Sequence, residues 1–164
     1  MSIKLIMFDV DGVMSNGNIT YTSSGEELKS FNVKDGLAIA SCKRLGIKTA
    51  IITGRKSNIV ERRAKELGID FLIQNSSNKI DDLQNILKNE KISLSEVAAI
   101  GDDLNDLKVL NSVAISFCPN NAVHTVKESV DVVLLKNGGE GAVREMLENI
   151  FKHNEKWNEF LALW

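Results

Sequence analysis

The chain has 164 residues, of which 43% are hydrophobic and 26% are charged, and its formal net charge is -2. This length suits one domain with a core large enough to be stable alone, and the absence of a basic block argues against nucleic acid as a partner. No apolar run approaches the roughly 18 residues of a membrane span, and no signal peptide is visible, so we expect neither a membrane partner nor export.

Short apolar runs alternate with amphipathic stretches along the whole chain. The apolar runs predict strands at residues 3–8, 47–53, 70–73, 97–101, 113–117 and 130–135. Their continuous apolarity is typical of strands covered on both faces, as in a parallel sheet. The stretches between them predict helices at residues 35–45, 57–67, 79–89, 104–111, 121–128 and 141–152. Strand–helix alternation predicts an α/β fold with a doubly wound, mostly parallel, Rossmann-like sheet.

One segment, at about residues 13–34, interrupts this alternation directly after the first strand. Ile19 and Tyr21 alternate with polar neighbours, Ser23-Ser24-Gly25 is a turn signal, and Leu28 and Phe31 lie on a return arm. This pattern predicts a β-hairpin that projects from the end of the first strand. A surface hairpin without a role is the alternative, but its place beside two acidic residues favours a flap over a site.

Polar side chains follow four of the predicted strands or the loop after them. Asp9 and Asp11 follow the first, Thr53 and Arg55 the second, Lys79 the third and Asp102 the fourth, with Asp103 and Asp106 close behind. Loops at the carboxyl ends of parallel strands form the ligand crevice of such sheets. We therefore expect these residues to converge on one rim.

The chemistry of this set points to phosphoryl transfer. Asp9 and Asp102 are hard oxygen ligands suited to Mg²⁺, which would also offset the repulsion between clustered acids. Thr53 and Lys79 suit a phosphate, as a hydrogen-bond donor and a positive charge. A carboxylate oxygen of Asp9 is placed to attack phosphorus and form an aspartyl-phosphate.

Asp11 suits a different role from Asp9. In a locally extended chain it faces the same side about 7 Å away. That position favours a general acid that protonates the leaving alcohol and later deprotonates the attacking water. Each motif alone has a simpler explanation, such as a solvated turn, a helix cap or a surface lysine. The order of all four on one sheet is what favours a catalytic site.

The series DxDG, a strand ending in TGR, a lysine and GDDxxD resembles the haloacid dehalogenase superfamily of phosphohydrolases. "FDVDGVMSNG", "GEELKSFNVKDGLAI", "IITGRKSNIVERRAKELGI", "GDDLND" and "GGEGAVREML" are similar to the 3-deoxy-D-manno-octulosonate 8-phosphate phosphatases, which lack a cap domain and serve lipopolysaccharide sugar synthesis. The resemblance covers nearly the whole chain. It implies one domain over residues 1–164, with a flap at about 13–34 and a tail at about 153–164.

The resemblance also implies a role for individual residues. Asp9 matches the nucleophile and Mg²⁺ ligand, Asp11 the acid/base with its backbone carbonyl on the metal, and Asp102 the remaining metal ligand. Thr53 and Lys79 match the phosphate binders. The positions that match contacts to the sugar acid are Asp11, Asn32, Val33, Lys34, Asp35, Gly36, Arg55 and Arg63. Arginine binds carboxylates with two hydrogen bonds, which suits a substrate that is also an acid. The alternative for Arg63 is a solvated helix face.

The resemblance also implies an assembly that involves the hairpin and the C-terminal tail. Its members without a cap domain are homotetramers, in which the hairpin and the C-terminal tail of one subunit help to close a neighbour's site. The tail here, "KWNEFLALW", is rich in apolar residues that would form an exposed patch in a monomer. The resemblance therefore implies a homotetramer, and packing of the tail on its own domain is the alternative.

Three other readings of the sequence remain open. Closely similar proteins hydrolyse nine-carbon sugar acid 9-phosphates, and Lys34, Glu140 and "QNSSNK" depart from the pattern common in the octulosonate enzymes, so the exact sugar is undecided. A receiver-type signalling domain also has paired acids, a hydroxyl and a lysine, but its second acid cluster does not follow the lysine. A non-catalytic module would not need the complete set of site residues. A cytidylyltransferase is not expected, because no Gly-rich nucleotide-binding segment is present.

The two cysteines, Cys42 and Cys118, are far apart and match no zinc spacing. We expect them to be reduced, buried thiols of a cytoplasmic protein.

Overall fold

Six parallel strands form the central sheet in a computed structural model that describes residues 2–164. The strand order is β5-β4-β1-β6-β7-β8. The strands are β1 (Leu5–Phe8), β4 (Lys48–Ile52), β5 (Phe71–Ile73), β6 (Val97–Ile100), β7 (Ile115–Cys118) and β8 (Val132–Val133). All five strand pairings are parallel, so the predicted α/β, Rossmann-like fold is confirmed.

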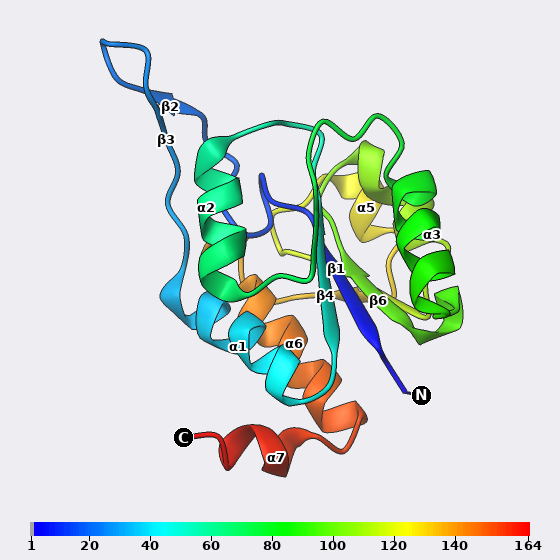
Figure 1. Cartoon of the computed structure of the whole chain (residues 1–164). Helices are drawn as coiled ribbons and strands as arrows, with labels where there is room; N and C mark the ends of the chain where they lie inside the picture. The colour runs from blue at the N-terminus through cyan, green and yellow to red at the C-terminus, as the bar shows by residue number, and fades with distance from the viewer. Residues whose placement is uncertain (1) are drawn as a thin grey trace.

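Helices cover both faces of this sheet (Figure 1). One face carries α1 (Val33–Arg44), α2 (Asn58–Leu67) and α6 (Ala142–His153), and the other carries α3 (Lys79–Glu90), α4 (Leu107–Leu110) and α5 (His124–Lys127). Two short 3-10 turns, η1 (Leu94–Glu96) and η2 (Leu104–Asp106), flank β6. Among the described residues, no helix has both the length and the apolar character that crossing a membrane would require.

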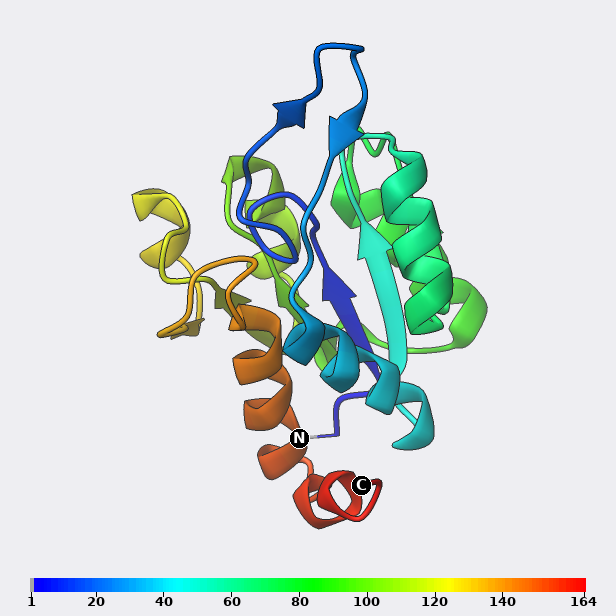
Figure 2. The same cartoon turned by 90° about the vertical axis from the view of Figure 1, so that its left-hand side faces the viewer.

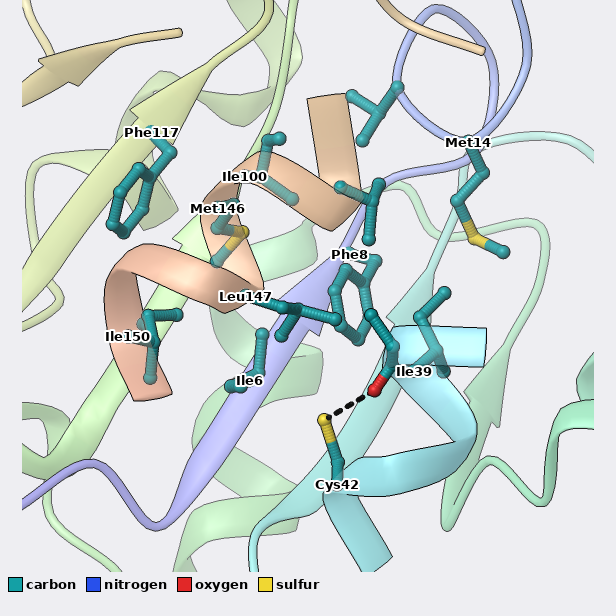
Figure 3. Packing of buried hydrophobic residues seen from close by; sticks show 14 of the residues in the cluster. Ile6, Phe8, Met14, Ile39, Cys42, Ile100, Phe117, Met146, Leu147 and Ile150 are labelled. Atoms are coloured by element: carbon teal, nitrogen blue, oxygen red, sulfur yellow. Dashed lines mark hydrogen bonds between the residues drawn. The ribbon is translucent and has the colours of Figure 1, made fainter. Parts of the chain in front are cut away.

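The core explains why the strands are apolar without alternation. Ile6 and Phe8 of β1 pack on the face of α1 and α6, beside Ile39, Met146 and Leu147 (Figure 3). Leu5 and Met7 of the same strand point to the other face, among residues of α3 and α4. Because both faces are dry, every position of β1 is buried.

Helix α1 begins two residues earlier than its apolar pattern predicts. The Asn32 side chain accepts a hydrogen bond from the Lys34 backbone N–H, which is the usual geometry of an N-cap. Val33 and Lys34 are therefore helical, and the predicted flap, assigned to residues 13–34, ends before them. The predicted start of α2 is correct: Ser57 caps it, and Gly68 ends it in the left-handed conformation at φ 68°.

Two predicted elements in the last third are much shorter than expected. The helix predicted at 121–128 is reduced to α5, because Asn121 uses its side chain to accept from the Gly138 backbone N–H in a turn. The strand predicted at 130–135 is reduced to β8. The Leu134 N–H still donates to the Cys118 carbonyl of β7, but those of Leu135 and Lys136 donate to the Glu145 carboxylate of α6, so the chain leaves the sheet there.

The predicted hairpin is present. β2 (Thr20–Tyr21) and β3 (Glu27–Leu28) form a separate antiparallel pair that projects beyond the carboxyl ends of the central strands (Figures 1 and 2). Its strands are exposed or half-buried and contribute little to the core. Within residues 2–164, the chain forms no cap domain beside this hairpin.

The C-terminal tail packs on its own domain. Phe160 of α7 (Trp157–Leu161) is buried, with its ring centroid 5.0 Å from that of Phe151 in α6. The two views place α7 at the opposite end of the molecule from the hairpin (Figures 1 and 2). Trp164, the last residue, is 70% exposed. The tail therefore does not reach the cleft of its own subunit.

Candidate active site

A small cleft of about 180 Å³ opens at the carboxyl ends of the three central strands, β4, β1 and β6. It is lined by Asp9, Asp11, Thr53, Gly54, Arg55, Asp102, Asp103 and Asn105. The sequence predicts that the polar loops meet at one rim, and the structure brings Asp9, Thr53 and Asp102 together there. Lys79 completes the group from beneath, since its side chain is only 3% exposed.

Lys79 bridges two carboxylates. Its Nζ lies 2.8 Å from Oδ1 of Asp9 and 2.7 Å from Oδ1 of Asp106. Burial alone would lower the pKa of Lys79, but the two carboxylates raise it, so the ammonium group remains charged. Lys79 is the first residue of α3, and this helix start fixes where its side chain enters the site.

Asp106 is the residue that sequence reasoning leaves without a role. It is 1% exposed, and while its Oδ1 faces Lys79, its Oδ2 accepts from the backbone N–H groups of Asp102 and Asp103. Asp103 and Asp106 form a capping box at the start of η2. The spacing in "GDDLND" is the signal that predicts this turn, but only the structure shows that the cap also holds Lys79.

Three carboxylates crowd around one point of the cleft. One oxygen each of Asp9, Asp102 and Asp106 lie within 4.8 Å of one another. Burial, followed by the charges of Asp9, Asp106 and Asp103, raises the pKa of Asp102 to about 7. Burial and the Asp106 charge likewise hold the pKa of Asp9 above its ordinary value, although Lys79 opposes them. Such a set fits a divalent cation, which offsets the repulsion with oxygen ligands.

The cluster contains both side chains predicted to hold the cation, Asp9 and Asp102. Its third acid is Asp106, which the sequence analysis does not assign to the metal. Both oxygens of Asp106 already have partners, which leaves Asp9 and Asp102 as the available carboxylates. A metal contact from the backbone carbonyl of Asp11 stays a prediction.

Gly12 is required where the first loop passes the Asp102 carboxylate. Its φ is 90°, and a Cβ at this position would lie 2.0 Å from Oδ2 of Asp102. Any side chain here would displace the carboxylate. The glycine of "DVDG" therefore lets the first and fourth loops meet closely enough to share a ligand.

Asp11 has one partner on the hairpin, Lys29, and one in the loop after β4, Arg55. Its Oδ1 is 2.5 Å from Nζ of Lys29, and its Oδ2 is 3.9 Å from Nε of Arg55. Glu27 joins this group, with its Oε1 3.3 Å from Lys29 Nζ and 3.0 Å from Arg55 Nη2. We call Asp11, Lys29, Glu27 and Arg55 the hairpin network. Its hairpin members, Glu27 and Lys29, lie in "GEELKSFNV", and no spacing rule in the sequence singles them out.

The remaining residues predicted to hold the sugar acid do not line this cleft. Asn32, Val33 and Lys34 line a separate hollow of about 370 Å³, together with Gly139 and Glu140. Of all the residues predicted for the sugar acid, the structure places only Asp11 and Arg55 in the catalytic cleft.

Asp35, Gly36 and Arg63 line neither the cleft nor the hollow. The Asp35 carboxylate is buried and accepts from the Arg144 backbone N–H in the first turn of α6, so it caps that helix. Burial is the main cause that raises its pKa to about 6. Gly36 makes room for Arg63, whose Nη2 would lie 2.3 Å from a Cβ at this position. These contacts give all three residues a structural part in the subunit.

Residues 71–147 match the family model described as haloacid dehalogenase-like hydrolase. The chain is 40% identical to the 3-deoxy-D-manno-octulosonate 8-phosphate phosphatase of Escherichia coli over 158 residues, which cover 96% of this chain and 84% of that protein.

Two solved structures of similar proteins contain ligands. The phosphatase of the same name from Moraxella catarrhalis, in complex with magnesium, phosphate and KDO, is 44% identical with a TM-score of 0.95, covering 98% of this chain and 92% of that one. The cobalt-bound deoxy-D-mannose-octulosonate 8-phosphate phosphatase from Haemophilus influenzae is 36% identical with a TM-score of 0.92, covering 97% and 93%.

Proposed function

Given that this chain belongs to the 3-deoxy-D-manno-octulosonate 8-phosphate phosphatases of the haloacid dehalogenase superfamily, we propose that it releases phosphate from that eight-carbon sugar acid. It is a phosphoric monoester hydrolase that depends on Mg²⁺. The observation that carries the proposal is the crowding of Asp9, Asp102 and Asp106 around buried Lys79, beside a cleft sized for a phosphate group.

Asp9 and Asp102 are the residues proposed to hold Mg²⁺, with the backbone carbonyl of Asp11. When bound, the cation neutralises charge on the phosphoryl oxygens and on the acids around it. Asp106 contributes indirectly, because it fixes Lys79 and the turn that carries Asp102.

Asp9 is the proposed nucleophile. Lys79 holds its Oδ1, so Oδ2 is the oxygen free of that ion pair. Attack by an Asp9 oxygen forms a bond to phosphorus while the ester oxygen leaves, and it produces an aspartyl-phosphate. Asp11 gives its proton to the leaving alkoxide. It then takes a proton from the water that releases inorganic phosphate, so both carboxylates return to their initial state.

Binding of the two acidic parts of the substrate is divided between residues. Thr53 and Lys79 are proposed to contact the phosphate, as donors placed around Asp9. Arg55, whose side chain is 40% exposed at the cleft, is proposed to bind the sugar carboxylate. The contact from Arg55 to Glu27 shows that its guanidinium already faces a carboxylate in the absence of substrate.

We also propose a homotetramer that works in the cytoplasm. Support comes from exposed apolar side chains along the hairpin and the start of α1, namely Ile19, Tyr21, Leu28, Val33 and Leu37. A patch of this kind favours contact with another subunit. The free, buried thiols of Cys42 and Cys118 suit a reducing compartment. Sedimentation at micromolar concentration tests the assembly, and a monomer would contradict it.

The test of the function is a panel of sugar acid phosphates. Phosphate release is measured as kcat/KM with the eight-carbon 8-phosphate and with nine-carbon 9-phosphates, in Mg²⁺ and in excess chelator. We expect many turnovers, the highest kcat/KM on the eight-carbon substrate and no activity with chelator. A preference for the nine-carbon substrates would contradict the proposed sugar. Release of a single equivalent of phosphate per protein would instead indicate a receiver-type domain.

A further inference from the structure

The two carboxylates proposed to do the chemistry each have a buried lysine. Lys79 joins Asp9 to Asp106, and Lys29 joins Asp11 to Glu27. The Lys29 side chain is 1% exposed, which is rare for a lysine and requires partners of opposite charge. Lys79 has a role in binding phosphate, but the proposed function gives Lys29 none.

The geometry of Lys29 bears on one oxygen of Asp11. Its Nζ lies 2.5 Å from Oδ1, whereas Oδ2 lies toward Arg55, which lines the cleft. An aspartate side chain has two rotatable bonds, and a second contact is needed to fix the plane of its carboxyl group. Lys29 supplies this contact, and it leaves Oδ2 as the oxygen on the side of the substrate.

The position of Lys29 in the chain also matters. It directly follows β3, so its ion pair ties the return arm of the hairpin to the loop after β1. One oxygen of Glu27, Oε1, contacts both Lys29 and Arg55. It thereby links the residue that pairs with Asp11 to the residue proposed to bind the sugar carboxylate. The return arm of the hairpin contacts two residues of the cleft wall, Asp11 and Arg55, although no hairpin residue lines the cleft itself.

We propose that Lys29 is a positioning residue, which holds Oδ1 of Asp11 so that Oδ2 is aimed at the leaving-group oxygen and then at the attacking water. This inference rests on the proposed function, because it requires that Asp11 transfer the proton. Loss of Lys29 is expected to slow proton transfer and to leave the phosphate site around Asp9 and Lys79 unchanged.

The test uses Lys29→Met and two substrates that differ in their need for a proton. The sugar acid phosphate leaves as an alkoxide and requires protonation, whereas para-nitrophenyl phosphate leaves as a weakly basic phenolate. We expect kcat on the sugar acid phosphate to fall about 10²-fold with little change in KM, as for a misplaced catalytic group. The burst of the first equivalent of nitrophenolate should stay within a few-fold of the unaltered enzyme.

Two further variants separate positioning from general damage. Lys29→Arg keeps the charge and should recover most of kcat. Lys88→Met, at an exposed lysine of α3, is the matched control and should behave as the unaltered enzyme in every assay. Thermal melting monitors the fold, and Lys29→Gln replaces Lys29→Met if the latter does not fold.

Each outcome of these assays either supports or contradicts the proposed role of Lys29. A loss confined to the alkoxide substrate and recovered in Lys29→Arg supports the inference. Equal losses on both substrates, or no loss on either, would overturn it. Failure of the proposed substrate is detected with the unaltered enzyme, which would then hydrolyse other alkyl phosphates but not the sugar acid phosphate. In that case Lys29→Met is compared with the unaltered enzyme on the alkyl phosphate instead, so the role of Lys29 is still tested.

Discussion

Asp9 and Asp11 are two residues apart, yet they are held by different kinds of structure. Asp9 is buried at the end of β1, the strand that pairs with β4 on one side and β6 on the other. Its partner Lys79 begins a 12-residue helix. Asp11 is half-buried, and its nearest partner, Lys29, follows the second strand of a hairpin whose strands have two residues each. One acid is fixed by the sheet, and the other by ion pairs to a projecting arm.

This difference separates two tasks. The half of the site proposed to attack phosphorus centres on Asp9, at the end of a strand covered by the core on both faces, where positions vary little. The half proposed to face the leaving sugar is built from the hairpin network, where a substrate can contact or displace charged groups. The phosphoryl chemistry and the choice of leaving group can therefore change independently. The predictions below test that separation.

The strongest prediction concerns Asp9. In Asp9→Asn, the amide cannot act as a nucleophile, so turnover should fall by about 10⁴-fold or more on every phosphate ester. Phosphate release and the thermal melting curve are measured together. Substantial activity in a folded Asp9→Asn protein would show that Asp9 is not the nucleophile. The proposed difference in role between Asp9 and Asp11 would then be wrong.

The next prediction tests how firmly the Asp9 half is held. Asp106→Ala leaves the buried Lys79 with one partner instead of two, and breaking such a pair costs about 3–5 kcal/mol of unfolding free energy. Asp103→Ala is the matched control, because it removes only an exposed cap and should cost about 1 kcal/mol. Urea unfolding gives both values. Equal costs would mean that Asp106 acts as a simple cap.

On the hairpin side, Arg55→Met should change binding but not chemistry. Loss of a charged hydrogen bond to the sugar carboxylate should raise KM for the sugar acid phosphate about 10- to 100-fold, with kcat nearly unchanged. KM for para-nitrophenyl phosphate, which has no carboxylate, should not change. If KM rises for both substrates, Arg55 contacts the phosphate and the division between the two halves is wrong.

The smallest effect is expected at Asp35, the residue that links the first turn of α1 to α6. Its pKa is raised by burial from 3.8 to about 6, so the folded state holds this proton more tightly than the unfolded state. Ionisation of Asp35 therefore lowers the free energy of unfolding as the pH rises from 3.8 to about 6, and this loss is constant at higher pH. Asp35→Asn keeps the acceptor for Arg144 and removes this dependence.

The measurement for Asp35 is urea unfolding at pH 4.5 and pH 7 (two conditions that bracket the titration). The free energy of unfolding of Asp35→Asn, minus that of the unaltered protein, should be larger at pH 7 than at pH 4.5. A difference that is the same at both pH values would show that the Asp35 carboxyl does not titrate in this range.

The sequence predicts the Asp9 half well because each of its signals is local. A continuous apolar run followed by Asp9, or by Thr53, identifies a strand end, and the rule for parallel sheets then brings those ends together. Asp106 is the exception: its turn is predictable from "GDDLND", but its pairing with Lys79 joins loops 27 positions apart. Such pairing depends on the angle at which α3 meets the sheet, which no local pattern contains.

The hairpin half is less predictable for a physical reason. Turn residues and alternation are sufficient to predict that a hairpin exists, yet they do not determine where it points. Lysine side chains usually lie at the surface, and only the fold shows that the side chain of Lys29 is buried against Asp11. Similarly, the contact from Asp35 of α1 to the Arg144 backbone N–H of α6, and the close approach of Arg63 of α2 to Gly36, join segments that no local pattern connects.

The loop at Gly138 and Gly139 packs directly against the loop that follows Asp11. A Cβ at Gly138 would lie 1.8 Å from the carbonyl oxygen of Gly12, and the Gly139 backbone N–H donates to the carbonyl of Val13. The support for the loop that carries Asp11 therefore comes from a segment far along the chain, between β8 and α6. During translation, the loop after β1 stays without this support until the segment beyond β8 has left the ribosome.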